Sequence, residues 1–281
     1  MGRRHPAHRH RRRGDSALRV PDRLRQQGLH SRHGVLLADA GKLDLDAPVT
    51  DVLPDFEVAD AAATTTITPR HLLNHTSGIE GDYVNDTGRG DNCLARYIEG
   101  VGSVGLTNPP GATMSYSSTA YNVLGRIIEV VTGGTWDEAL KELLCDPLGL
   151  EHTMTLPEEV LRFRAAMGHM GEPGETPVPT PPWNMLPRSA GPYGGICAPA
   201  PTWRGSPRPS WTAAPRRTCG RPEGHLRPLL WHLTPVSHTP AKTVYAGRRN
   251  EKDAWIPVVF YALADSTRYV HFGVRATAKP A

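Results

Sequence analysis

The stretch Asn108–Leu150, NPPGATMSYSSTAYNVLGRIIEVVTGGTWDEALKELLCDPLGL, decides the fold of this chain. It opens on Asn-Pro-Pro-Gly, a strong turn signal. Apolar residues then recur at helical spacing from Tyr121 to Val131, which predicts an amphipathic helix. A glycine pair ends this helix, and Thr135 with Glu138 has the capping-box spacing that predicts the start of a second helix.

Tyr116 lies on the short connection between the turn and the first of these helices. An isolated loop tyrosine is most often a packed aromatic side chain. A loop held by rigid helices is, however, a common place for a catalytic side chain. Its position alone leaves both roles open for Tyr116.

Two upstream segments carry further motifs: Gly41–Val49 is GKLDLDAPV, and Ile67–Gly78 is ITPRHLLNHTSG. The residues of the opening stretch that belong to the same pattern are Pro110, Gly111, Met114, Tyr116, Ser117, Tyr121, Leu124 and Gly125. Together these segments resemble the serine β-lactamase and D-Ala-D-Ala peptidase family, in particular its esterase-like and penicillin-binding-protein-like members. The resemblance covers Val35 to Ala198.

The resemblance implies an α+β fold with a helical region and an antiparallel sheet flanked by helices. It implies a serine hydrolase that transfers an acyl group from a β-lactam, a D-amino-acid peptide or a small ester, without a cofactor. Tyr116 matches the family's catalytic tyrosine, which relays a proton. Ser118 stands where an asparagine orients the substrate amide, and its shorter hydroxyl offers a single donor.

The family's nucleophile motif, Ser-x-x-Lys, is missing from its expected place at Val20–His30, which contains no lysine and is not expected to be helical. A shift of one base with GC-rich codons restores a suitable segment. In that shifted frame the Gln26 codon followed by C encodes Ser or Asn, and the Gln27 codon followed by G encodes Lys or Arg. We therefore expect residues 1–34 to be a basic, irregular segment translated out of frame.

A second break is expected near Pro199. Residues 199–240 carry nine prolines without any helical or strand period, so we expect another irregular, frameshifted segment. Residues 241–281 are expected to form a small β extension, with strands at Trp255–Leu263 and Arg268–Val274.

The family's third motif, (Lys/His)-Thr-Gly on a core strand, is also missing. Lys242-Thr243-Val244 and His238-Thr239-Pro240 lack the glycine, and neither is expected in a strand, so both are attributed to chance. Without two of its motifs, the chain is expected to be inactive as translated. The alternative is a non-catalytic pseudogene product of the same ancestry.

Charge divides the chain in the same places. Val35–Ala198 holds 22 Asp and Glu against 9 Lys and Arg, a balance of −13, whereas the flanks are basic by 17. A basic arm at residues 1–33 permits another alternative, a nucleic-acid-binding protein. That alternative predicts strongly salt-dependent DNA binding, and we expect nucleic acid not to be the partner.

Composition sets aside several other classes. The four cysteines have no C-x-x-C spacing, which disfavours a zinc site or a redox pair. His71 and His75 lie four apart on a predicted helix, but no third ligand is evident, so no metal site is expected. No run of 18 apolar residues predicts a membrane span, and no signal peptide is visible, although members of the resembling family are often exported.

Overall fold

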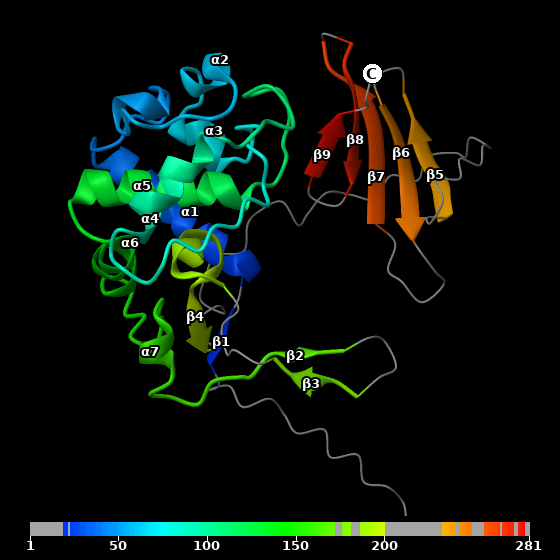
Figure 1. The fold of residues 1–281 in the computed structure, drawn as a ribbon. Coiled ribbons are helices and arrows are strands. Elements are labelled where there is room, and N and C mark those ends of the chain that lie inside the picture. The colour runs from blue at the N-terminus through cyan, green and yellow to red at the C-terminus, as the bar shows by residue number, and fades with distance from the viewer. Residues whose placement is uncertain are drawn as a thin grey trace, which may run out of the picture.

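The computed structural model describes residues 19–21, 23–171, 176–180, 186–199, 232–239, 242–248, 256–264, 266–272 and 275–278. Within these residues a helical body stands beside an antiparallel five-stranded sheet (Figure 1). The class is α+β, and no helix in the described ranges is long and apolar enough to cross a membrane.

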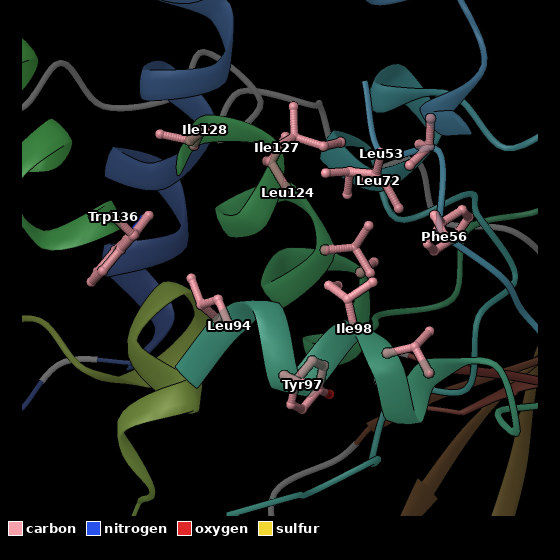
Figure 2. Packing of buried hydrophobic residues seen from close by; sticks show 14 of the residues in the cluster. Leu53, Phe56, Leu72, Leu94, Tyr97, Ile98, Leu124, Ile127, Ile128 and Trp136 are labelled. Atoms are coloured by element: carbon pink, nitrogen blue, oxygen red, sulfur yellow. The ribbon is translucent and has the colours of Figure 1, made fainter. Parts of the chain in front are cut away.

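The helical body is built around α5 (Ser118–Thr132), the helix predicted from the apolar spacing. Leu124, Ile127 and Ile128 are completely buried in α5, and Figure 2 shows them facing side chains from the surrounding helices. The helices that pack on α5 are α1 (Arg23–Asp39), α3 (Pro69–Leu73), α4 (Cys93–Val101), α6 (Trp136–Leu140) and α8 (Gly191–Gly194). Each such buried aliphatic side chain stabilises the fold by about 1.5–3 kcal/mol.

Local capping signals place the helix ends. The Thr68 hydroxyl accepts the His71 N–H, and His71 Nδ1 accepts the Thr68 N–H at 3.2 Å, so the two residues close a reciprocal cap on α3. Thr135 and Glu138 form the predicted capping box of α6. Gly133 ends α5 at a φ of 77°, a left-handed conformation that favours glycine.

Short elements fill the rest of the body. The helical ones are η1 (Val49–Asp51), α2 (Ala61–Thr64), η2 (Lys141–Cys145, a π-turn that extends α6), α7 (Pro157–Val160) and η3 (Arg188–Ala190). Two antiparallel strand pairs join β1 (Arg19–Pro21) to β4 (Cys197–Pro199), and β2 (His169–Met170) to β3 (Val178–Pro179).

The C-terminal sheet is an antiparallel meander in the order β5-β6-β7-β8-β9. Its strands are β5 (His232–His238), β6 (Lys242–Arg248), β7 (Ile256–Ala262), β8 (Arg268–Phe272) and β9 (Arg275–Ala278). The sequence predicted β7 and β8. It did not predict β5, because Pro235 weakens the strand signal; in the structure the β5–β6 register shifts between Pro235 and Ser237, an irregularity that accommodates a proline.

Two expectations need correction. Residues 23–34 are not irregular, since α1 begins at Arg23 and crosses the expected border at 34 without a break. Arginine, leucine and glutamine are good helix formers, and the helix also buries His30 and His33. Strand β5 likewise lies inside the segment 199–240, most of which, residues 200–231, falls outside the described residues, as do residues 1–18.

Candidate active site

Two chain segments, residues 75–81 and 107–118, lie side by side and together carry Tyr116. Their backbone hydrogen bonds run from Gly111 N–H to Thr76 O at 2.8 Å, from Ser115 N–H to His75 O at 2.8 Å and from Ser118 N–H to Gly81 O at 3.2 Å. The Tyr116 backbone is thus fixed on both sides of the residue.

Glycines make this close approach possible. Gly78 has a φ of +76°, and a Cβ atom there would lie 1.9 Å from the Asn108 carbonyl oxygen. A Cβ atom at Gly81 would lie 2.6 Å from the carbonyl oxygen of Tyr116. Any larger residue at either position would push the two segments apart.

The Tyr116 side chain is half-buried and packs on His75, with ring centroids 4.7 Å apart and planes inclined by 33°. The same imidazole stacks on Tyr121 at 4.7 Å and 19°. Ser117 Oγ caps α5 by accepting the Ala120 N–H at 3.0 Å. Tyr116 therefore ends a rigid loop one residue before the helix cap.

Ser118, the predicted substrate contact, is the first residue of α5 and is half-buried. It lies two positions after Tyr116, and the bond from its N–H to Gly81 O fixes its backbone. The structure thus brings both predicted site residues to one short, well-anchored segment.

Helix α1 approaches this segment through Ser31. The Ser31 hydroxyl lies 2.7 Å from the Tyr121 hydroxyl, which also donates to the Leu73 carbonyl at 3.1 Å. A phenol has a single hydroxyl hydrogen, so Ser31 donates its own to Tyr121. Ser31 is the one serine of α1, and Gly34 stands one helical turn further on.

Beside Ser31, α1 buries two histidines. Trp136 Nε1–H donates to His30 Nδ1 at 2.9 Å, whereas neither ring nitrogen of His33 has a hydrogen-bond partner among the described residues. Burial lowers the pKa of His30 to about 3, with a further contribution from His33, and lowers the pKa of His33 to about 4. Both imidazoles are consequently neutral at pH 7. Sequence reasoning missed this pair because the segment was expected to be out of frame.

The C-terminal sheet reaches the same segment from the other side. The Tyr261 hydroxyl of β7 is 2.7 Å from Thr113 Oγ1, and the Ala276 N–H of β9 donates to Ser115 Oγ at 3.2 Å. Arg275 pairs with Asp82, next to Gly81.

Lys242 and Thr243 were expected to lie outside any strand, and the structure corrects this: both belong to β6, and Lys242 is the register partner of Tyr261. His238 ends β5, and Thr239 follows the strand and exchanges backbone hydrogen bonds with Lys242. Val244, in place of glycine, follows Thr243 on the strand.

His71 and His75 do not share a helix as expected. Helix α3 ends at Leu73, and His75 adopts a left-handed conformation with a φ of 60°. His71 is engaged in capping and His75 in ring contacts. Among the described residues, no group of three or more histidine, cysteine or carboxylate side chains could hold a metal ion.

Comparison with known proteins matches residues 34–205 to the model of the Beta-lactamase family. Penicillin-binding protein 4 of Amycolatopsis lactamdurans is 59% identical over 160 residues, which are 57% of this chain and 42% of that protein. Esterase EstB of Burkholderia gladioli is 34% identical over 152 residues, 49% of this chain and 38% of that protein.

Solved structures agree on the fold. The octameric penicillin-binding protein homologue from Pyrococcus abyssi superposes with a TM-score of 0.55 at 15% identity, over 94% of this chain and 89% of that one. EstCE1, a hydrolase with promiscuous acyltransferase activity, superposes with a TM-score of 0.56 at 21% identity, over 66% of this chain and 57% of that one. The chain spans less than half the length of the curated relatives it matches. Since the family model covers more than half of this chain, the chain belongs to the Beta-lactamase family.

Proposed function

We propose that this chain carries the site of a serine acyl-transfer hydrolase in which Tyr116 is the catalytic tyrosine and Ser118 the substrate-amide contact. The observation that carries the proposal is the rigid placement of Tyr116 directly before the cap of α5, inside the residues matched to the family. The substrate class is a β-lactam, a D-amino-acid or peptidoglycan-like peptide, or a small ester.

We also propose that the chain as translated does not turn over substrate. An acyl-transferring serine needs a neighbouring group that takes up its proton. Ser31 donates to a neutral phenol whose pKa is raised by burial, and α1 contains no lysine, so the lysine of the family's Ser-x-x-Lys motif is missing. Strand β6 reads Lys242-Thr243-Val244 and has no glycine after Thr243, so it does not carry the family's (Lys/His)-Thr-Gly motif.

We further propose that two frameshifts caused this loss. The family match begins at residue 34 and ends at residue 205, close to the borders at 35 and 199 where charge and proline content change. Sequencing the coding DNA for insertions and deletions at these two borders tests this part directly. Independent sequence reads that show no insertion or deletion at either border would refute the two frameshifts.

The experiment that tests the site uses the translated chain and a frame-corrected chain in which the family's (Lys/His)-Thr-Gly strand is also supplied. We expect the translated chain to leave nitrocefin and p-nitrophenyl acetate unchanged and the corrected chain to hydrolyse at least one of them. In the corrected chain, Tyr116→Phe should lower kcat by about 10²–10⁴, the usual contribution of a positioned general base. Ser118→Asn should preserve or raise it. Equal turnover with phenylalanine at position 116 would refute the role of Tyr116.

A nucleic-acid-binding function receives no support from the family match, which excludes the basic arm. Residues 1–18 of that arm lie outside the described residues. Filter binding to duplex DNA at low salt distinguishes the two functions, and we expect no specific retention.

A further inference from the structure

His75 contacts three consecutive residues of the segment 107–118 that carries Tyr116. Its carbonyl accepts the Ser115 N–H at 2.8 Å, and its Nδ1 accepts the Ser117 N–H at 3.2 Å. Its ring packs on Tyr116 itself. One residue therefore holds the residue before Tyr116, the residue after it and the ring between them.

The backbone of His75 is in a conformation that only glycine adopts readily. Its φ of 60° is positive, and in the described residues the one other non-glycine residue with this property is Ser266. Such a conformation persists where surrounding contacts over-determine it, and it is common at functional sites. Here it turns the chain after α3 so that the imidazole and the carbonyl of His75 face the same partner segment.

The hydrogen bond from Ser117 also fixes the form of the ring. Nδ1 accepts a hydrogen bond and therefore carries no proton, which leaves the neutral imidazole protonated at Nε2. Burial lowers the pKa of His75 to about 4, and among the described residues the titratable side chains whose rings pack on it are Tyr116 and Tyr121. Burial raises the pKa of Tyr121, so that phenol is neutral at pH 7, and the His75 ring supplies a neutral, flat surface with one acceptor.

We propose that His75 is the positioning residue for Tyr116: it fixes the phenol ring by stacking and the adjacent backbone through Nδ1. This inference rests on the proposed role of Tyr116 and deepens it, because a proton relay acts only from a fixed place. Tyr121 stacks on the same imidazole and thereby helps to hold the His75 ring in place.

Three variants separate the contributions. His75→Asn keeps a residue that tolerates positive φ and places Oδ1 where Nδ1 was, but it removes the ring. His75→Gly still adopts the positive φ but removes both the ring and the hydrogen-bond acceptor. His71→Asn is the matched control, because it makes the same substitution in a histidine that caps α3 and has no ring contact with Tyr116.

The readout is the rate of nitration of Tyr116 by tetranitromethane, mapped by mass spectrometry, with the buried Tyr97, whose ring packs on Tyr83, as internal reference. We expect the rate to rise several-fold in His75→Asn and further in His75→Gly, and to stay at the wild-type value in His71→Asn. The upfield ring-current shift of the Tyr116 ring protons should be lost in both His75 variants. Equal nitration rates and ring shifts in wild type, His75→Asn and His75→Gly would overturn the inference.

The wild-type protein supplies a test that does not depend on how a variant folds. In ¹⁵N-labelled protein at pH 7, His75 Nδ1 should show the shift of an unprotonated nitrogen, and a contact should appear between the His75 and Tyr116 rings. A proton on Nδ1, or no ring contact, would overturn the inference. Its failure is distinguishable from failure of the proposed function: a loosely held Tyr116 removes only the inference, whereas full turnover of frame-corrected Tyr116→Phe removes the catalytic role of Tyr116 and leaves the contact between the His75 and Tyr116 rings measurable.

Discussion

Acid should destabilise the helical body through the two buried histidines of α1. His30 and His33 are fully buried, and their folded pKa values are about 3 and about 4 against an ordinary 6.5. The unfolded chain therefore binds more protons than the folded chain below pH 6.5. The stability that depends on neutral imidazoles is fully present above pH 6.5 and is lost as the pH falls from there towards the folded pKa values.

The magnitude follows from the distance between the working pH and the unfolded pKa. At pH 5 each histidine costs about 2 kcal/mol, since one pKa unit corresponds to about 1.4 kcal/mol. The pair together costs about 4 kcal/mol, a large share of the 5–15 kcal/mol that stabilises a typical domain. His33→Leu should halve this loss, and it also removes two ring nitrogens that have no hydrogen-bond partner in the described part of the chain.

The assay is urea unfolding followed by far-UV circular dichroism at pH 7, 6 and 5. We expect the free energy of unfolding of His33→Leu to fall by about 2 kcal/mol less between pH 7 and pH 5 than that of the wild type. The exposed His152→Gln serves as the control and should keep the wild-type dependence. A His33→Leu protein that keeps the full pH dependence would refute the assignment of the acid sensitivity to this buried pair.

Three further predictions concern the packing around the site. Leu124→Ala, in the completely buried centre of α5, should lower the free energy of unfolding by about 2–5 kcal/mol, and a loss below about 1 kcal/mol would contradict its central place. Gly78→Ala should cost more than about 1 kcal/mol, because it needs a positive φ and brings a methyl group onto the Asn108 carbonyl. Arg275→Gln should cost less than about 1 kcal/mol in thermal unfolding at low salt, and nothing at high salt, because Asp82 is 68% exposed; an equal loss at both salt concentrations would argue against a screened ion pair.

The helix ends around the site could be predicted because their signals are local. The caps at Thr68 and Thr135, the glycine stop at Gly133 and the apolar spacing of α5 each depend on residues within a few positions of one another. The N-terminal part of helix α1, residues 23–34, was missed because its sequence shows little apolar periodicity, and one tertiary contact that holds it, the bond between His30 and Trp136, joins residues 106 positions apart.

The candidate site divides in the same way. Tyr116 and Ser118 could be placed at the start of α5 from sequence, because the turn and the helix signals flank them. The contact of His75 with Tyr116 could not, because it depends on a positive φ at a residue that rarely adopts one and on the pairing of two separate segments. The available signal was only the histidine that follows α3 in His-Thr-Ser-Gly.

The most direct test of the account is the intact mass of the purified, translated chain after incubation with a fluorescent penicillin. Penicillin-binding protein 4 of Amycolatopsis lactamdurans, 59% identical over the shared 160 residues, is the positive control. The account predicts an unchanged mass and no fluorescent band for this chain, because α1 carries no serine with a lysine one turn away. Stoichiometric addition of one penicilloyl group to any serine, Ser31 included, would contradict it.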